Sequence, residues 1–480
     1  MITFLKKTKY YLTLSKRINY LEVPKGIERI DDKKYENYKE LIIVFISDSV
    51  KYIGYSAFKN CTSLTEITLP RELEFIDYNV FEGCTSLQKI HVPNVIETLK
   101  FNIFFGSQKL HRIKVPESLK LLNNSTFNSK EISKFVIPNY ITEICDYAFE
   151  GCSSLTSVVV PDSVTKIGIS AFEGCSLLID VTIPNNISII PNNTFKECSS
   201  LVNLIIPSNI KKIGDNVFEG CSSLVSITIP DSITEISKSA FSKCSSLINI
   251  NIPNSITKID DYAFSGCYSL TKIVIPDSVI ETCCYMFRGC SSLIEVTISK
   301  SAEKIGDYAF EGCSSLTKIS IPNSVKEIGN YAFSKCTSLT DITFTDNIKQ
   351  ISEYTFSGCS SLTNISIPDG VTKICNHAFS GCSSLTNISV PDLVTEIGEY
   401  AFSGCTSLTN IIISKTINEI GNFAFYLNSS LTTIDIPNSI KKIGDFAFYQ
   451  CSSLTNVTIP DNLINIGKGA FPETCVCTKV

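Results

Sequence analysis

Apolar and polar residues follow a pattern along the chain that predicts short strands joined by tight corners. Counted from a recurrent Phe as position 0, apolar or small residues recur at positions −1, 0, +3, +6, +9, +11, +15 and +18. The spacing of two between +9 and +11 is the period of a strand that buries one face. Pro follows position +11 in most copies and ends this strand, because it has no backbone donor.

Two further elements are expected in each copy. The residues from +15 to +18 predict a second short strand, and the stretch D-Y-A-F-S-G-C predicts one helical or 3-10 turn that ends at Gly. Each copy would therefore make one complete turn of the chain, which we call a coil.

The recurrent Phe sets the length of one coil. Nineteen Phe residues follow one another at intervals of 23 residues, except for one interval of 22 between Phe127 and Phe149. Degenerate copies centred on Tyr35 and Leu12 extend the pattern almost to the N-terminus. The set is Phe58, Phe81, Phe104, Phe127, Phe149, Phe172, Phe195, Phe218, Phe241, Phe264, Phe287, Phe310, Phe333, Phe356, Phe379, Phe402, Phe425, Phe448 and Phe471.

A chain of 480 residues would ordinarily suggest two or three domains. The repeat predicts instead a solenoid of about twenty coils, because coils that cannot fold alone gain stability from their neighbours. We expect a single solenoid domain over residues 12–477. A basic N-terminal cap segment over residues 1–11 would precede it, and residues 478–480 would form a C-terminal tail.

The repeated motif is distinctive. The pattern L-x-x-I-x-I-P-x-x-V-x-x-I-G-x-x-A-F-x-G-C-x-x-L resembles the BspA-like class of leucine-rich repeat, over roughly residues 12 to 477. This resemblance implies a curved leucine-rich-repeat arc with a parallel β-sheet on its concave face, and short second strands and turns on the other faces. It also implies a surface antigen or adhesin that binds host or matrix proteins, which is an analogy rather than a result of the spacing.

The 21 cysteines are explained by the same pattern. Fifteen of them occupy position +3, while Cys145, Cys283 and Cys375 stand where most coils have Gly. A column of small groups at a corner indicates buried thiols that fill space. Neighbouring thiols would lie near the ~4.8 Å strand spacing, which alone does not exclude disulfides. The odd total favours free thiols, and the zinc-ligand spacing C-x₂-C does not occur.

Charge and composition exclude several classes of function. The net charge of −5 argues against a nucleic-acid binder, and no apolar run is long enough for a membrane helix. Only three His residues are present, and no nucleophile, phosphate loop or carboxylate pair breaks the repeat in a way that catalysis would require. We therefore expect no enzyme activity, no cofactor and no bound metal.

Positions +8 and +10 should point outward from the main strand and form a surface for a protein ligand. Most of them are neutral, as at Asn249 and Asn251. Three adjacent coils differ, because they carry six basic or imidazole groups: Lys89, His91, His111, Arg112, Lys114 and Lys134. One interpretation is a binding site for an acidic protein surface or an anionic polysaccharide. The other is a solvated basic face. His377, at position −2, is expected to be exposed and structural.

The two termini leave alternatives open. Met1 to Asn19 is basic without a signal-peptide core, which fits a solvated cap or attraction to anionic lipid. The last four residues, Cys477 to Val480, have the C-a-a-X form of a prenylation site, and Cys475 offers a second acylation site. Lys479 is not aliphatic, however, and Cys477 also fits position +6 of a last coil.

Two hypotheses follow for function. The first is a non-enzymatic adhesin-like solenoid, at the cell surface or associated with a membrane, that binds a protein along its sheet. The second is a cytosolic or inner-membrane-face scaffold, which the missing signal peptide favours. An uncapped last coil also predicts end-to-end homodimers.

Overall fold

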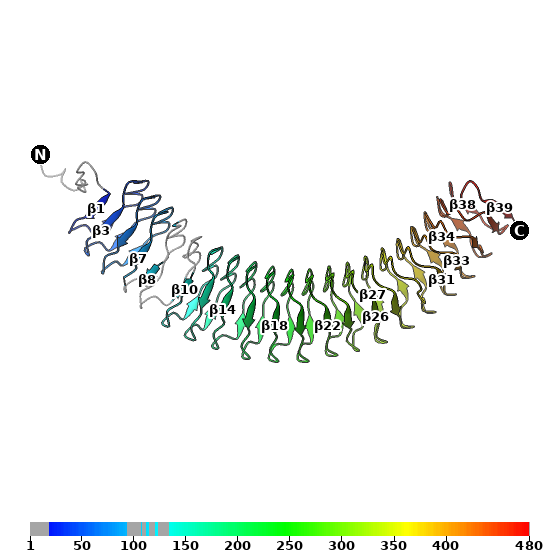
Figure 1. Ribbon diagram of the computed structural model, residues 1–480, viewed down its shortest axis with the longest axis horizontal. Coiled ribbons are helices and arrows are strands. Elements are labelled where there is room, and N and C mark those ends of the chain that lie inside the picture. Colours follow the sequence, from blue (N-terminus) through cyan, green and yellow to red (C-terminus); the bar gives the residue numbers. More distant parts are fainter. Residues whose placement is uncertain (1–18, 94–106, 108–111, 115–120, 123–133, 480) are drawn as a thin grey trace. The chain divides into compact units, whose positions relative to one another are not determined.

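The computed structural model describes residues 19–93, 107, 112–114, 121–122 and 134–479. The chain divides into two units, Met1–Leu224 and Val225–Val480, and each is built from the same kind of coil. Within each unit, the strands of successive coils lie side by side in register (Figure 1). Each described coil except the one at residues 364–366 contributes a main strand around positions +8 to +10, and most contribute a second strand at +17 and +18.

The described residues of unit 1 contain seventeen strands. Its main strands are β1 (Tyr20–Val23), β3 (Ile43–Ile46), β5 (Glu66–Thr68), β7 (Lys89–His91), β8 (Arg112–Lys114), β10 (Lys134–Val136), β12 (Ser157–Val159), β14 (Asp180–Thr182) and β16 (Asn203–Ile205). Its second strands are β2 (Arg29–Ile30), β4 (Tyr52–Ile53), β6 (Phe75–Ile76), β9 (Leu121–Leu122), β11 (Glu143–Ile144), β13 (Lys166–Ile167), β15 (Ile189–Ile190) and β17 (Lys212–Ile213).

Unit 2 continues the pattern. Its main strands are β18 (Ser226–Thr228), β20 (Asn249–Asn251), β22 (Lys272–Val274), β24 (Glu295–Thr297), β26 (Lys318–Ser320), β28 (Asp341–Thr343), β31 (Asn387–Ser389), β33 (Asn410–Ile412), β35 (Thr433–Ile434), β37 (Asn456–Ile459) and β39 (Val476–Lys479). Its second strands are β19 (Glu235–Ile236), β21 (Lys258–Ile259), β23 (Glu281–Thr282), β25 (Lys304–Ile305), β27 (Glu327–Ile328), β29 (Gln350–Ile351), β30 (Lys373–Ile374), β32 (Glu396–Ile397), β34 (Glu419–Ile420), β36 (Lys442–Ile443) and β38 (Asn465–Ile466).

All pairings within the units are parallel, and they follow the repeat length. In unit 2, Ile227 pairs with Ile250, one coil of 23 residues further on. In unit 1, Leu121 pairs with Glu143, which is an offset of 22 residues. The shorter interval between Phe127 and Phe149 therefore reappears as a shorter register step.

Burial follows the predicted pattern. Main strands show an exposed–buried–exposed sequence, so that Ile250 is buried while Asn249 and Asn251 are exposed. The described Phe residues at position 0 are buried, except for the half-buried Phe471, and neighbouring rings stack with centroids 5.0–5.9 Å apart, as for Phe425 on Phe448 and Phe58 on Phe81. Stacked aromatic rings and buried aliphatic side chains thus form one continuous core inside each unit.

The cysteines at position +3 lie in this core as free thiols. Most donate from Sγ to the carbonyl of the Phe in the preceding coil, at 3.1 Å for Cys84 to Phe58 and 3.3 Å for Cys405 to Phe379, and Cys61 donates to Tyr35 at 3.2 Å. Ser107, which replaces Cys in one coil, donates to the carbonyl of Phe81 in the same way, at 2.9 Å. The side chain at +3 therefore adds a second hydrogen bond to a buried carbonyl, because Phe58 also accepts the backbone N–H of Cys61 at 3.2 Å.

The corner around the Phe differs in detail from the predicted helical turn. No helix occurs in the described ranges, and the corner consists of tight turns in which two residues adopt a left-handed backbone. In one coil these are Tyr262, with φ of 59°, and Gly266, with φ of 74°. Residues at −2, 0 and +2 each donate a backbone hydrogen bond to the next coil, as Phe264 does to Met286 at 3.0 Å. This alternation of backbone direction satisfies donors between coils and prevents a continuous helix.

The predicted solenoid of parallel strands is confirmed, and so is the second strand of each coil. The expectation of a single domain over residues 12–477 stays a prediction. The basic segment over residues 1–11 lies outside the described residues, as does Val480 of the 478–480 tail.

Candidate functional site

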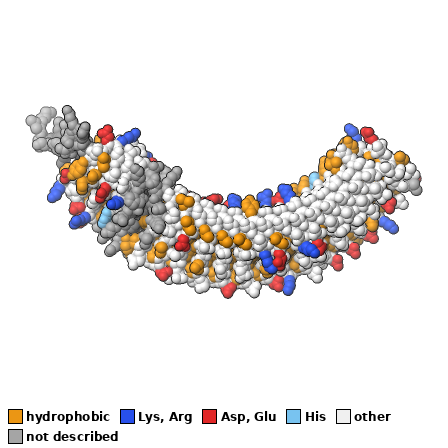
Figure 2. Space-filling view, viewed as in Figure 1, with side chains coloured by type: hydrophobic (Ala, Val, Ile, Leu, Met, Phe, Trp, Pro, Cys, Tyr) orange, Lys and Arg blue, Asp and Glu red, His pale blue; other side chains and the backbone are white. Residues whose placement is uncertain are grey.

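The outward positions of the main strands form an exposed surface in each unit. Their side chains are exposed on both sides of each buried central residue, as at Ser226 and Thr228 of β18. Most are neutral, and the visible face of the molecule accordingly shows charges of both signs scattered among uncharged groups (Figure 2). Some are apolar, and Ile205 of unit 1 is 86% exposed. Such a surface can make hydrogen bonds and apolar contacts with a protein partner.

The structure brings four of the six predicted basic residues onto paired strands. Lys89 and His91 of β7 are exposed, and their Cα partners on β8 are Arg112 and Lys114. Lys134 lies on β10, whose partner is β12, and His111 lies outside the described residues. The side chains of Arg112, Lys114 and Lys134 also lie outside the described part. The basic binding site therefore stays a prediction, supported by the register of β7 and β8.

The C-terminal cysteines occupy a strand that departs from the expected alignment. Cys477 of β39 pairs with Val457 of β37, which places it at position +9 and not at the predicted position +6. The connection between the repeated Phe and the main strand is shorter in the last coil. Val476 begins its strand five positions after Phe471, whereas Asn456 begins its strand eight positions after Phe448.

The two thiols differ in exposure. Cys477 is exposed, while Cys475 is half-buried and burial, followed by the neighbouring Cys477, raises its pKa to about 11. Lipidation at either residue stays a prediction, as does the end-to-end homodimer. The described residues include no helix that could span a membrane.

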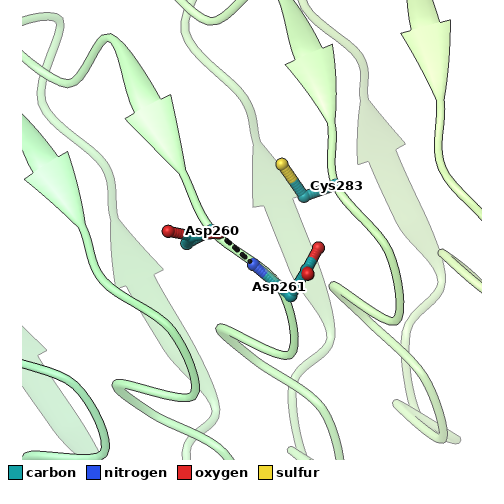
Figure 3. Close-up of side chains that lie close together, drawn as sticks. All are labelled: Asp260, Asp261 and Cys283. Carbon is teal, nitrogen blue, oxygen red and sulfur yellow. Dashed lines mark hydrogen bonds between the residues drawn. The ribbon is translucent and has the colours of Figure 1, made fainter.

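One group of potential metal ligands occurs in the described ranges. The ligand atoms of Asp260, Asp261 and Cys283 lie within 4.8 Å of one another, on neighbouring coils of unit 2 (Figure 3). Their atoms already have partners, because Asp260 pairs with Lys258 at 2.8 Å and Asp261 accepts the backbone N–H of Cys284 at 2.9 Å. Burial, followed by the nearby Glu281 carboxylate, raises the pKa of Cys283 to about 12. These groups stabilise the corner between coils and do not form a preorganised site.

His377 belongs to an aromatic column that the sequence reasoning did not single out. Position −2 carries a half-buried ring in every coil from Tyr262 to Phe446, and neighbouring rings stack with centroids 4.3–5.1 Å apart. The imidazole of His377 lies between Tyr354 and Tyr400. Tyr at intervals of 23 residues was the signal for this column. The residues are Tyr262, Tyr285, Tyr308, Tyr331, Tyr354, His377, Tyr400, Phe423 and Phe446.

The sequence pattern also did not predict a groove on the outward face of unit 2. It encloses about 800 Å³ and is lined by residues of four successive coils, from Asp341 to Ile412. The signal in the sequence was a pair of substitutions at the end of β28, where Phe344 replaces the usual Ile and Thr345 replaces the usual Pro.

Comparison with known proteins agrees with this geometry. Six copies of the family model described as "BspA type Leucine rich repeat region" match residues 7–132, 120–248, 189–315, 234–363, 281–393 and 372–480. The chain belongs to the BspA-type leucine-rich repeat family. The resemblance noted in the repeated motif is thereby confirmed over both units.

One solved structure supports the same conclusion, and two others show sequence similarity. A leucine-rich repeat protein from Bacteroides ovatus is 32% identical and matches with a TM-score of 0.67, over 72% of this chain and 92% of that one. A leucine-rich repeat protein from T. pallidum is 30% identical over 38% of this chain and 78% of its own, with a TM-score of 0.29. A leucine-rich cell surface protein from Faecalibacterium prausnitzii is 27% identical over 82% and 88%, with a TM-score of 0.26. No curated protein matches the chain.

Proposed function

We propose that this BspA-type repeat protein is a non-enzymatic interaction scaffold that binds a protein partner along the outward face of its main strands. The observation that carries the proposal is the separation of roles within each strand: the central residue is buried, and its two neighbours are exposed in coil after coil. The outward positions are thus free to vary for binding, while the inward ones maintain the solenoid.

The chemistry of the other columns supports binding over catalysis. The thiols at position +3 are buried, and burial raises the pKa of Cys290, Cys359 and Cys405 to about 12. A thiol with such a pKa stays protonated near neutral pH and is a poor nucleophile. Their hydrogen bonds to Phe carbonyls give these cysteines a structural role.

The surface around β7 supports an acidic partner for unit 1. Lys89 and His91 are exposed and point outward, and neither forms an ion pair with another described residue. The paired positions on β8 add Arg112 and Lys114 to the same part of the sheet. Two adjacent strands with this composition would attract an acidic protein surface or an anionic polysaccharide, with a strong dependence on salt.

The test uses immobilised fibronectin, laminin and collagen as matrix-protein probes, and a heparin fragment as the anionic probe. We expect the full chain to bind at least one of the matrix proteins and the heparin fragment. The variant K89E/H91E should weaken heparin binding about tenfold or more, which corresponds to 1.4 kcal/mol.

A control places the same charges away from the main strands, at exposed Asn376 and Asn422 of unit 2, and circular dichroism checks its fold because both side chains accept backbone hydrogen bonds. The control N376E/N422E should bind as the natural sequence does. Failure to bind any matrix protein would contradict the scaffold proposal, and equal loss in the control would contradict its assignment to the sheet face.

A further inference from the structure

The groove of unit 2 combines an opening in the sheet with a row of amide side chains. It holds about 800 Å³ on the outward face of β28, residues 364–366, β31 and β33. Its lining includes Asp341, Phe344, Asp346, Asn364, Asn387 and Asn410. Every residue of unit 2 from 225 to 479 is described, so that the groove can be compared with each neighbouring coil.

The opening arises from a local departure from the repeat. Ile321 and Ile367 occupy position +11 of neighbouring coils and are 4% and 5% exposed, whereas Phe344 at the same position is only half-buried. Its ring meets the core ring of Phe356 edge-on at 5.7 Å, because the space of an Ile is too small to hold it.

The sheet is interrupted at the same place. Residues 364–366 form no strand, and the one bridge there joins Asn364 to Asn387. Among the coils of residues 225–479, this is the one whose main segment is not a strand. The bulky Phe344 and the interrupted pairing together account for a recess in an otherwise regular surface.

The lining of the groove offers hydrogen-bonding groups in two rows, of which the Thr343 hydroxyl already donates to Ser320 at 3.3 Å. Asn364, Asn387 and Asn410 occupy position +8 of three successive coils, about one strand spacing of 4.8 Å apart. The side-chain amides of Asn364 and Asn410 bond no other described residue, and that of Asn387 donates only to Thr386, at 3.2 Å. A parallel row of hydroxyls follows at position +10, on Thr343, Ser366 and Ser389. Amide and hydroxyl rows of this kind can both donate to and accept from a polyol.

The charge of the groove is of one sign. Asp341 and Asp346 are the charged residues of the lining. Asp341 lies 3.9 Å from Lys318 in an exposed pair, and such pairs contribute little. Asp346 has no ion pair or hydrogen bond through its carboxylate with any described residue. The groove is therefore complementary to a cation and disfavours an anion.

We propose that this groove binds a linear oligosaccharide of amino sugars with free amines. The amide and hydroxyl rows would bond the sugar hydroxyls, the exposed side of Phe344 would pack against the apolar face of one ring, and the two carboxylates would pair with amines. A sugar unit in an extended chain is close to one strand spacing in length, so that successive units meet successive coils. An extended peptide is the competing occupant of the groove, and hexalysine tests it below. The proposal does not depend on the protein partner proposed above.

The experiment measures binding of four probes to the full chain by calorimetry in mildly acidic buffer, where the amines are protonated. The probes are a glucosamine hexamer, an N-acetylglucosamine hexamer, a heparin hexasaccharide and hexalysine. We expect the glucosamine hexamer to bind to the groove most tightly, and the N-acetylated hexamer more weakly. The D341N/D346N variant should weaken glucosamine binding about tenfold or more.

Two further variants locate the site. Phe344→Ile restores the usual residue at position +11, and should close the groove and abolish binding while keeping the fold, as checked by circular dichroism. Asn387→Ala should weaken binding about fivefold, the effect of one hydrogen bond. Asn249→Ala, at the same position of a coil outside the groove, is the matched control and should have no effect.

Three outcomes would overturn the proposal. These are no binding of the glucosamine hexamer, binding that both D341N/D346N and Phe344→Ile leave unchanged, and hexalysine binding at least as tightly as the sugar. The last result would assign the groove to a basic peptide. None of these outcomes affects the matrix-protein test.

Discussion

Units 1 and 2 have the same pattern of buried residues and differ on their outward face. In both, stacked Phe rings and buried thiols fill the same positions of most described coils. On the outward positions, unit 1 carries Lys89 and His91 on β7, whereas unit 2 carries Asp341 on β28, with Asp346 beside it in the groove. The difference shows that the buried columns fix the solenoid, while the outward columns can acquire opposite charges without any change to the scaffold.

A second difference lies at position −2, where every described coil has a left-handed backbone. Unit 1 has mainly Ser and Asn there, and Asn216 donates from its side chain to Asn193 at 3.0 Å. Unit 2 has stacked rings, such as Tyr308 on Tyr331 at 4.4 Å. Asn tolerates a left-handed backbone better than Tyr does, so that stacking must offset the additional strain in unit 2.

The largest expected effect tests what the two units share. Phe172→Ala in unit 1 and Phe333→Ala in unit 2 should each reduce local stability by about 3–5 kcal/mol, because both remove a fully buried ring. Hydrogen exchange of the neighbouring coils measures this stability within each unit. If the loss of local stability in one unit is less than half the loss in the other, the two units do not have equivalent cores.

The next effect tests the aromatic column of unit 2. Tyr331→Ala should destabilise the adjacent coils by about 1–3 kcal/mol, since it removes two stacking contacts and leaves a side chain on a left-handed backbone. Tyr331→Phe keeps the ring and is the control. Unchanged hydrogen exchange in the Ala variant would mean that stacking does not stabilise this corner.

A smaller effect is expected at the same position of unit 1. Asn216→Ala should lower the free energy of unfolding by about 0.5–1.5 kcal/mol. It removes one half-buried hydrogen bond and replaces a residue that is suited to a left-handed backbone. Asn216→Gly should recover part of the loss, because Gly adopts a positive φ freely. Hydrogen exchange in the coils around residue 216, measured on the full chain in denaturant, would show the difference in stability between the two variants.

The smallest effect is a dependence of stability on pH at His377. Burial lowers its pKa, although the carboxylates of Glu399 and Glu353 oppose the shift, and the rings of Tyr354 and Tyr400 cover both faces. The unfolded chain therefore takes up the proton first as the pH falls. The neutral imidazole therefore stabilises the folded chain fully above the ordinary histidine pKa of about 6.5. This stabilisation is lost as the pH falls below that value and through the lowered pKa of the folded chain.

The variant His377→Phe isolates this contribution. It keeps a ring in the column and has no titratable group, so that unit 2 should lose less stability than in the natural sequence as the pH falls from about 7 to about 5. Equal losses in the two proteins would assign the pH dependence to other groups.

Much of the fold could be predicted from sequence because the repeat samples the same environment many times. The burial of Ile250 between exposed Asn249 and Asn251 follows directly from a period of two. The left-handed backbone at Tyr262 could not be predicted in this way, since Tyr has no preference for that conformation and accepts it only through stacking and inter-coil hydrogen bonds.

The candidate sites were less predictable. Lys89 and His91 were evident from their charge, but the groove beside Phe344 depends on how a single large residue disturbs the pairing of its neighbours. The position of Cys477 beside Val457 depends on a shortened connection that no periodicity encodes. Sequence periodicity thus describes the regular coils well and says little about where they are interrupted.

The central claim is that outward residues alone decide which ligand each unit binds. The most direct measurement titrates heparin hexasaccharide and glucosamine hexamer against the natural sequence, K89E/H91E and D341N/D346N. We predict that K89E/H91E loses heparin binding and keeps glucosamine binding, and that D341N/D346N does the reverse. Variants that change both ligands equally, or neither, would contradict the account.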